Sequence, residues 1–312
     1  MIKIGVVGTG GWGKNHVRVL SELGCLAAVC DINKDRLAEF SKKYGVPGYV
    51  SLEEMLKKER FDAANICTPA STHFSMASMT LTAGLHTFVE KPMTTTSSEG
   101  EKLLDAAKSS NRTLTVGFIE RFNPPITELK KTISDRSMGD PILLEFHREN
   151  RRGEGIDDVG IVKDASVHDI DTARWLFAEE PKVVFARVGA FQPLLQHEDF
   201  ATILLGFSGR KTAFLVTNWI TPHRVRTMTA VFSGAVIDVD FVTQQTSLHE
   251  KNMTTVPSRP FQEPLTLELK EWVAALTEGR KALVTGEDGL KTMRVAEAVL
   301  ASSSTGTPIY LS

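Results

Sequence analysis

The feature that most constrains the fold is a glycine-rich turn directly after a short apolar run near the start of the chain, in the segment IKIGVVGTGGWG. Gly8, Gly10 and Gly13 have GxGxxG spacing, and the residues after them place Val17 and Leu20 on one helical stripe. In such a turn the first glycine permits the bend, the second lets the backbone approach a pyrophosphate, and the third lets helix and strand pack closely. The segment therefore predicts a strand, a turn and a helix whose start can hold phosphates.

An acidic residue closes the second apolar run. Asp31 ends LAAVCD, eighteen residues after Gly13. At that position a carboxylate can accept hydrogen bonds from both hydroxyls of a ribose and repel a 2′-phosphate, which favours NAD over NADP. A helix cap or loop acid is the alternative for Asp31, because DINKD also has the composition of a cap. The complete strand–helix–strand context favours dinucleotide binding.

Strand and helix signals alternate through about the first 120 residues, with six strand-like runs in all. Two of the intervening helices carry capping-box spacing at their starts, Ser51 with Glu54 and Thr96 with Glu99. Alternation of this kind is typical of a parallel sheet with helices on both faces. We therefore expect an α/β Rossmann domain, a doubly wound parallel sheet, over residues 1–122.

The pattern changes after RFNPP, where Pro124 and Pro125 interrupt any continuing helix. Strand-like runs then follow one another with few helices between them: PILLEFHREN, KVVFARVGAF, DFATILLGF, KTAFLVTNW, RTMTAVFSG and AVIDVDF. SGR and SGA between such runs predict hairpin turns. We expect residues 123–312 to form an α+β domain with a large, open, mostly antiparallel sheet and two C-terminal helices.

Composition excludes several classes of function. Thirty-six basic residues nearly balance thirty-eight acidic ones, and no basic cluster of the kind that binds nucleic acid is present. No run approaches the roughly 20 apolar residues that span a bilayer, and the first residues lack the layout of a signal peptide, so we expect no membrane partner and a cytoplasmic location. The three cysteines lie in apolar runs, which argues against a disulfide framework or a zinc cluster, and we expect no metal.

A lysine follows the fifth strand, in the segment EKP formed by Glu90, Lys91 and Pro92. Ligands bind at the carboxyl ends of the strands in open α/β sheets, so this ammonium could lie beside a nicotinamide ring. Spacing alone favours the alternative, a solvated loop lysine.

The segment VKDASVHDID concentrates acids and a histidine where a helix begins. Asp164 and His168 are four residues apart, so on a helix they share one face, which Asp171 and Trp175 continue. The residues of a second stripe can enter the core, namely Val167, Ile170 and Phe177. The sequence therefore predicts a polar face that can line a cleft.

Histidine ordinarily titrates near pH 6.5, at about the point where it can accept a proton from an alcohol, and a neighbouring carboxylate can orient it. The alternative interpretations have equal weight. Asp164 could be an N-cap, His168 a half-buried histidine with its hydrogen bonds satisfied, and the remaining acids of the first turn, Asp169 and Asp171, could simply stabilise the helix dipole.

Taken together, GxGxxG, the acid after the second strand, ICTPASTH, EKP followed by Glu99, and DxxxH at a helix start resemble the Gfo/Idh/MocA family of NAD(P)-dependent sugar and inositol oxidoreductases. The resemblance covers essentially the whole chain. It implies a Rossmann domain and a C-terminal open sheet that mediates homodimers or homotetramers, with the last helix and strand packing back toward the first domain.

The resemblance also implies roles for individual residues. Those that would bind the cofactor are Gly8, Gly10, Gly11, Trp12 and Gly13 at the pyrophosphate, Asp31 at the adenosine ribose, Thr68, Pro69 and His73 along the cofactor, and Glu90 and Lys91 at the nicotinamide ribose. Those that would line the reacting carbon are Lys91, Asp164 and His168.

The segments VGFIERFNP and NWITPHRVRTMTAVF look like the branch of the family that includes UDP-N-acetylglucosamine 3-dehydrogenases, although FHRENRRGEGIDD lacks a proline-rich turn associated with that branch.

The resulting hypothesis is NAD-dependent oxidation of a secondary hydroxyl, at the 3-position of a nucleotide-activated amino sugar. His168 would accept the proton, Asp164 would orient the imidazole and Lys91 would stabilise the alkoxide, although lysine and histidine could exchange roles. Asn123 and Arg148 are the residues expected to bind the substrate, Arg148 through its diphosphate. A free-sugar or myo-inositol dehydrogenase and a non-catalytic NAD-binding regulator are the two alternatives.

Overall fold

The computed structural model describes residues 2–152, 158–192 and 197–311. The chain divides into two compact units. The first comprises Met1–Phe118 with Leu265–Met293, and the second comprises Ile119–Pro264 with Arg294–Ser312. In the described part of the chain, no helix combines the length and the apolar character that a membrane crossing requires.

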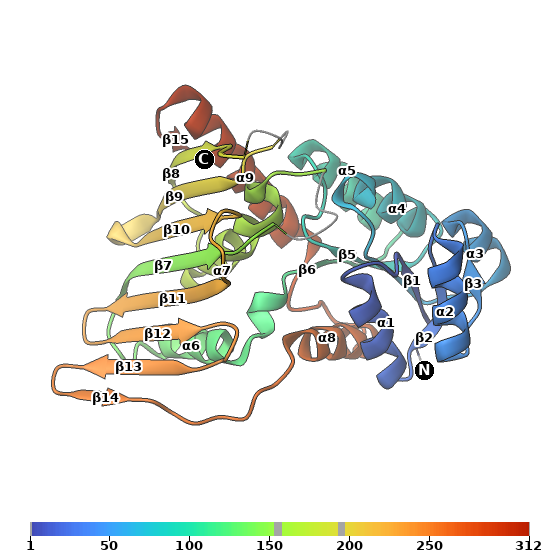
Figure 1. The fold of residues 1–312 in the computed structure, drawn as a ribbon, viewed down its shortest axis with the longest axis horizontal. Helices are drawn as coiled ribbons and strands as arrows, with labels where there is room; N and C mark the ends of the chain where they lie inside the picture. Colours follow the sequence, from blue (N-terminus) through green and yellow to red (C-terminus); the bar gives the residue numbers. More distant parts are fainter. Residues whose placement is uncertain (1, 153–157, 193–196, 312) are drawn as a thin grey trace. The chain divides into compact units, whose positions relative to one another are not determined.

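The first unit is built on a six-stranded sheet in which every neighbouring pair is parallel (Figure 1). Its strands are β1 (Ile4–Val7), β2 (Leu26–Cys30), β3 (Gly48–Tyr49), β4 (Ala63–Ile66), β5 (His86–Glu90) and β6 (Leu114–Gly117). Their order is β3-β2-β1-β4-β5-β6, the order of a Rossmann sheet. The predicted doubly wound parallel sheet is confirmed.

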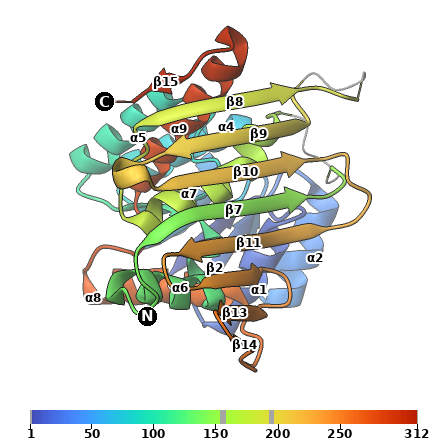
Figure 2. The same cartoon turned by 90° about the vertical axis from the view of Figure 1, so that its left-hand side faces the viewer.

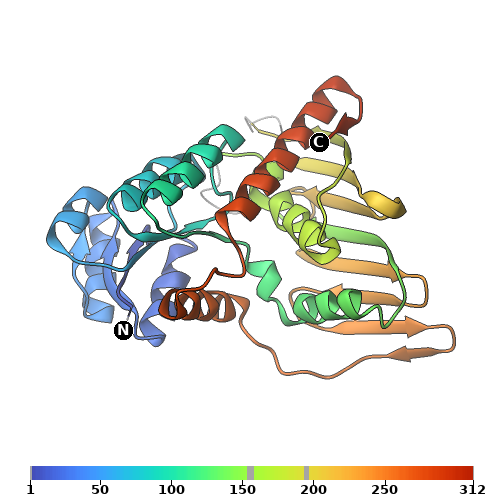
Figure 3. The ribbon, with the colours of Figure 1, turned by 180° about the vertical axis from the view of Figure 1, so that it is seen from behind.

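Helices cover both faces of this sheet. They are α1 (Gly13–Glu22), α2 (Lys34–Tyr44), α3 (Leu52–Lys58), α4 (Ala70–Thr82), α5 (Ser97–Ser109) and α8 (Pro264–Glu278). In Figures 1 and 3, α4 and α5 lie on one side of the sheet and α1 and α8 on the other. Both faces are therefore buried, which explains why the strands read as continuous apolar runs.

Local capping explains where two of these helices begin. Thr96 and Glu99 form a complete capping box at α5, with each side chain accepting from the backbone N–H of the other residue. At α3 the Ser51 side chain accepts from the Glu54 N–H, but the Glu54 carboxylate instead accepts from Lys58. Of the two predicted capping boxes, the one at α5 is therefore complete, and at α3 only the hydrogen bond to Ser51 is formed.

A late segment of the chain completes the core of the first unit. Trp272 of α8 is fully buried, and its ring lies 5.2 Å from that of Phe88 in β5, centroid to centroid. Leu265–Met293 therefore belongs to the first unit, whereas the sequence analysis placed it in the second domain. The unit includes the start of helix α9 (Gly286–Thr305), where the Cα of Gly286 faces Leu104 and Leu114.

The second unit contains a nine-stranded sheet with the order β14-β13-β12-β11-β7-β10-β9-β8-β15. Its strands are β7 (Pro141–Glu149), β8 (Val183–Gly189), β9 (Phe200–Gly206), β10 (Thr212–Asn218), β11 (Val225–Phe232), β12 (Val236–Asp240), β13 (Thr246–Glu250), β14 (Met253–Thr255) and β15 (Ile309–Tyr310). Among the described strands of this sheet, only β7 and β10 pair in parallel. The predicted large and mostly antiparallel sheet is confirmed.

One face of this sheet carries helices, and we call it the inner face. The helical segments of the unit are η1 (Ile119–Phe122), α6 (Pro124–Asp135), the π-helical turn η2 (Val162–Ser166), α7 (Val167–Phe177), the short turn η3 (Ser208–Arg210) and the part of α9 from Arg294 onward. Figure 2 shows the opposite, outer face toward the viewer, and Figure 3 shows α6 and α7 on the inner side. Along β7 the buried side chains are those that point inward: Leu144, Phe146 and Arg148.

The edges of the sheet differ from the expectation. β13 and β14 extend it beyond the strands that the sequence analysis named, and the last strand, β15, pairs with β8. β15 therefore belongs to the second unit's sheet, and the packing of the last helix and strand toward the first domain stays a prediction. The two predicted hairpin turns are present, at Gly209 between β9 and β10 and at Gly234 between β11 and β12.

We expect Trp272→Ala to lower the free energy of unfolding by about 3–5 kcal/mol, because the buried indole contacts Phe88 and its loss leaves a cavity. Thr277→Ala, at an exposed position of the same helix, should change it by less than about 0.5 kcal/mol. Urea unfolding followed by circular dichroism measures both. Equal midpoints for the two variants would contradict the assignment of α8 to the core.

Candidate active site

The cofactor residues predicted in the first unit all follow the carboxyl ends of parallel strands. Gly8 follows β1, Asp31 follows β2, Thr68 comes shortly after β4, and Lys91 follows β5. β1 and β4 are neighbours, and the strand order reverses between them. Ligands bind at such a switch point, outside the carboxyl ends of the strands. The fold thus brings these residues to the same side of the sheet, at the carboxyl ends of its strands.

The glycine turn is shaped by contacts that leave no space for side chains at two positions. A Cβ at Gly13 would lie 2.0 Å from the Gly8 carbonyl oxygen, and one at Gly8, whose φ is +89°, would lie 2.6 Å from the Cys67 carbonyl oxygen. The ideal Cβ of Gly11 meets nothing within 4 Å among the described residues. Helix α1 begins without a side-chain cap at Trp12 and without an acid in its first turn. The turn therefore fits a bound pyrophosphate.

Asp31 is buried and its carboxylate is fixed from several directions. One oxygen accepts from the backbone N–H and the hydroxyl of Thr9, each at 2.8 Å, and the other accepts from the Asn33 N–H at 2.9 Å. Burial alone would raise the pKa of Asp31, but these hydrogen bonds and the charge of Arg36 outweigh burial and lower it. Asp31 is thus held ionised, so that both of its carboxylate oxygens accept hydrogen bonds.

Glu90 connects the glycine turn to the lysine of EKP. Its carboxylate accepts from the Trp12 indole N–H at 3.1 Å and from the Lys91 backbone N–H at 3.1 Å, and it lies 2.9 Å from Nε2 of His16. Burial would raise the pKa of Glu90, but the contacts with His16 and the charge of Lys91 outweigh burial and lower it. An ionised Glu90 therefore fixes both Trp12 and the backbone of Lys91.

His16 is a residue of this site that the sequence analysis missed. It is fully buried in α1, and its Nδ1 lies 3.0 Å from the amide nitrogen of Asn65. The Cys67 thiol donates to the Asn65 amide oxygen, which leaves the amide NH₂ to donate to Nδ1. The proton of a neutral His16 then lies on Nε2, toward Glu90. A histidine three residues beyond a GxGxxG turn was the available signal, since that position faces the sheet.

His73 does not present its ring to the open edge of the sheet. It is buried, with Nδ1 2.7 Å from the Pro92 carbonyl oxygen and Nε2 2.8 Å from the Thr68 carbonyl oxygen. The ring therefore joins the loop after β4 to the loop after β5, which carries Lys91. Pro69 is exposed at the start of α4, and Lys91 is half-buried.

In the second unit, Asp164 and His168 lie on either side of a helix junction. Asp164 is inside the π-helical turn η2, and His168 is in the first turn of α7. The expectation of one regular α-helix through both residues, and the alternative of Asp164 as an N-cap, are therefore wrong. Both side chains are half-buried. π-helical turns occur frequently at functional sites, where they change the direction of side chains relative to a regular helix.

The residue after His168 anchors the helix to the sheet. Asp169 is 1% exposed and accepts from Nε and Nη2 of Arg148 in β7, at 2.7–3.1 Å. The same Arg148 Nη2 lies 3.0 Å from Glu120 of η1. Burial alone would lower the pKa of Arg148, but the charges of Asp169 and Glu120 outweigh burial and raise it. This cluster fixes the start of α7 against β7.

A second ion pair anchors the next turn. Asp171 is 1% exposed and accepts from Nε and Nη2 of Arg121, at 2.8 and 2.7 Å. Nη1 of Arg174 lies 3.5 Å from the same carboxylate. The prediction that Asp171 continues an open polar face with His168 is therefore wrong. The predicted apolar stripe is confirmed, because Val167 and Ile170 are fully buried.

The two residues predicted to bind substrate are buried in the same cluster. Arg148 is 3% exposed, and two of its three guanidinium nitrogens are taken up by acids. Asn123 is buried, and its NH₂ donates to the Phe241 carbonyl oxygen at 3.0 Å and to Glu120 at 3.2 Å. Arg148 is thus held in a structural ion pair with α7. Direct binding of a diphosphate by Arg148 stays a prediction.

The described residues contain no group of three or more side chains arranged to hold a metal ion. Part of FHRENRRGEGIDD, the segment in which the sequence departs from the branch it resembles, lies outside the described residues at 153–157.

We expect Asp171→Asn to lower the free energy of unfolding by about 3–5 kcal/mol, because the substitution leaves the buried Arg121 guanidinium without its counter-charge. Asp140→Asn removes the same charge from an exposed pair with Arg136 and should cost at most about 1 kcal/mol. Guanidinium chloride unfolding of both variants gives the comparison. A similar loss in the two would show that the buried pair does not anchor α7.

Three family models match consecutive parts of the chain. Residues 2–118 match "Oxidoreductase family, NAD-binding Rossmann fold", residues 126–237 match "GFO/IDH/MocA C-terminal domain", and residues 233–311 match "Oxidoreductase family, C-terminal alpha/beta domain". Together they extend over almost the whole sequence.

Individual relatives agree with these models. The chain is 26% identical over 305 residues to a UDP-N-acetylglucosamine 3-dehydrogenase of Acidithiobacillus ferrooxidans, and the match covers 95% of each chain. A solved structure of that enzyme superposes with a TM-score of 0.88 at 25% identity, covering 97% of this chain and 98% of that one. It is 27% identical over 326 residues to an inositol 2-dehydrogenase of Rubrobacter xylanophilus, covering 98% and 92%. An oxidoreductase from Agrobacterium radiobacter, solved with NAD+, L-tartaric acid and magnesium, shares the fold with a TM-score of 0.90 at 21% identity, covering 99% and 98%. The chain belongs to the Gfo/Idh/MocA family and is an oxidoreductase with an NAD-binding Rossmann domain.

Proposed function

We propose that the protein is an NAD-dependent dehydrogenase that oxidises a secondary hydroxyl of a sugar, at the 3-position of a nucleotide-activated amino sugar such as UDP-N-acetylglucosamine. The observation that carries the proposal is the anchored junction between η2 and α7, which presents Asp164 and His168 half-buried next to two fixed ion pairs. The name of the Acidithiobacillus ferrooxidans relative supports the nucleotide sugar.

NAD is the proposed cofactor. The glycine turn leaves space for a pyrophosphate, and the ionised Asp31 suits the adenosine ribose. A carboxylate at that position repels the 2′-phosphate of NADP. Trp12 and the loops that His73 joins would border the rest of the cofactor, and Glu90 would fix Lys91 at the nicotinamide ribose.

The reaction requires one proton acceptor and one group that stabilises negative charge on oxygen. The glycine turn and Asp31 would hold NAD+, which when bound would supply the acceptor for the hydride at C4 of its nicotinamide ring. His168 would take the proton from the substrate hydroxyl, and Asp164 would hold the imidazole in orientation. The Lys91 ammonium would stabilise the developing alkoxide. Lysine and histidine can exchange these two roles without a change in the overall chemistry.

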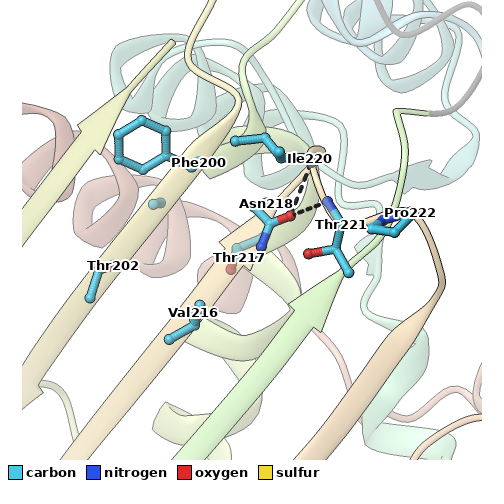
Figure 4. A pocket seen from close by; sticks show the side chains of 9 residues that line it. Phe200, Thr202, Val216, Thr217, Asn218, Ile220, Thr221 and Pro222 are labelled. Atoms are coloured by element: carbon cyan, nitrogen blue, oxygen red, sulfur yellow. Dashed lines mark hydrogen bonds between the residues drawn. The ribbon is translucent and has the colours of Figure 1, made fainter. Parts of the chain in front are cut away.

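The proposal includes a cytoplasmic location. It also includes a homo-oligomer formed through the outer face of the nine-stranded sheet. Phe185 and Leu204 are paired across β8 and β9 and are 45% and 40% exposed. The pocket in Figure 4 lies beside them on β9 and β10, where Asn218 accepts from the backbone N–H groups of Ile220 and Thr221. Exposed apolar surface of this kind is typical of an interface between copies.

A substrate panel tests the function directly. NADH absorbance is followed with UDP-N-acetylglucosamine, other nucleotide sugars, free sugars and myo-inositol, with NADP+ in parallel. We expect reduction of NAD+ with UDP-N-acetylglucosamine. Turnover of myo-inositol alone would favour the activity named for the Rubrobacter xylanophilus relative, and turnover of a free sugar alone would favour a free-sugar dehydrogenase. No turnover with any member of the panel would favour an NAD-binding regulator.

We expect His168→Ala to lower kcat by about 10²–10⁴ while the Kd for NAD+, measured by calorimetry, stays unchanged, since His168 lies in the second unit and acts on the substrate. His223→Ala, at an exposed position of the same unit, is the matched control and should keep normal turnover. Normal turnover in His168→Ala would end the assignment of the base.

A further inference from the structure

A like-charged pair lies on the inner face of the second unit's sheet. Arg226 of β11 is directly opposite Arg148 of β7 in the antiparallel register, so the two side chains share one face. Like charges directly opposite each other destabilise a sheet unless other groups compensate them. The two acids nearby are Asp169 and Glu120.

Asp169 and Glu120 contact only one of the two arginines. Both bind Arg148, through Nε and Nη2, at 2.7–3.1 Å. The side chain of Arg226, by contrast, forms no hydrogen bond or ion pair with any residue that the structure describes, and its Nε is buried without an acceptor. Nη1 of Arg148 is likewise buried without an acceptor. Two guanidinium groups on adjacent strands therefore each keep an unused donor.

The electrostatic setting of Arg226 is unfavourable in the absence of a further negative charge. Burial and the charge of Arg148 lower the pKa of Arg226 to about 10, and the acids Glu120 and Asp169 compensate only in part. Buried cations in proteins are normally paired, because an uncompensated charge is costly to desolvate. Arg226 keeps partial exposure to solvent, so an anion can reach it from outside the chain.

Arg226 is connected through Arg148 to the helix that carries the proposed base. Arg148 bridges from the strand opposite Arg226 to Asp169, the residue directly after His168. The ring of Phe241 lies 5.6 Å from the Arg148 guanidinium carbon and closes another side of the cluster. An anion bound at Arg226 would therefore lie on the sheet side of the junction that carries His168.

We propose that Arg226, together with Nη1 of Arg148, forms a binding site for a carboxylate or phosphate group of a ligand. A planar guanidinium binds both groups through two parallel N–H···O bonds, which is why arginine is preferred for them. The identification of that ligand as the substrate rests on the proposed dehydrogenase function, but the anion site itself does not.

Calorimetric titration of the full chain with inorganic phosphate, UDP and D-glucuronate, in chloride-free buffer with saturating NAD+, tests the site. We expect the wild type to bind at least one probe and Arg226→Met to bind it about tenfold more weakly or worse. Arg226→Lys, which keeps the charge but loses the two-pronged geometry, should be intermediate and serves as the comparison if Arg226→Met does not fold. Arg187→Met, on the exposed outer face of β8, should match the wild type.

The pattern of probes distinguishes the source of the anion. Binding of phosphate and UDP indicates a phosphate-bearing ligand, and binding of D-glucuronate alone indicates a sugar acid. The proposal is overturned if no probe binds the wild type, or if the Arg226 variants bind with wild-type affinity. The two proposals can fail separately. If the wild type turns over no sugar in the panel but binds an anion that Arg226→Met does not bind, the dehydrogenase function is rejected and the anion site is retained.

Discussion

The arrangement of the second unit depends on two buried arginine–aspartate pairs that fix α7. Arg148 reaches Asp169 from β7, and Arg121 reaches Asp171 from η1, so that alternate residues of one helical turn are tied to two different elements. Removing charges from water is costly, and such pairs are stable only when the geometry satisfies most of their hydrogen bonds. Asp171, which was expected on an open polar face, is thus an anchor together with Asp169, and His168, the residue directly before Asp169, is positioned by them.

The first unit was predictable to a large extent because its information is local. An apolar run, a glycine turn and an amphipathic helix identify each strand–helix unit, and chain order then places Gly8, Asp31 and Lys91 at the same edge of a parallel sheet. The contacts between His16, Asn65 and Glu90 were not predictable in the same way. They join residues 49 and 74 positions apart, and which polar groups meet across a buried sheet depends on packing that periodicity does not record.

In the second unit the strands were predictable and their partners were not. Alternation along β7 indicates a strand with one buried face, but nothing local specifies that it pairs in parallel with β10 and antiparallel with β11. The same limit applies to the turn at Asp164. A spacing of four residues is compatible with α-helical and π-helical turns, and only the packed structure distinguishes them. The burial of Arg148 and Asp171 was missed because charged residues are rarely buried unless paired.

The cluster on the inner face shows how a fold can retain charge for a ligand. One arginine opposite another is unfavourable in a sheet, and the two acids that could relieve the pair both bind Arg148, which ties α7 to β7. Replacing Arg226 with an apolar residue would remove the repulsion without breaking either anchor of α7. Within the second unit, Asp169 and Glu120 compensate the charge of Arg226 only in part, and a negative group from outside the chain would complete the compensation.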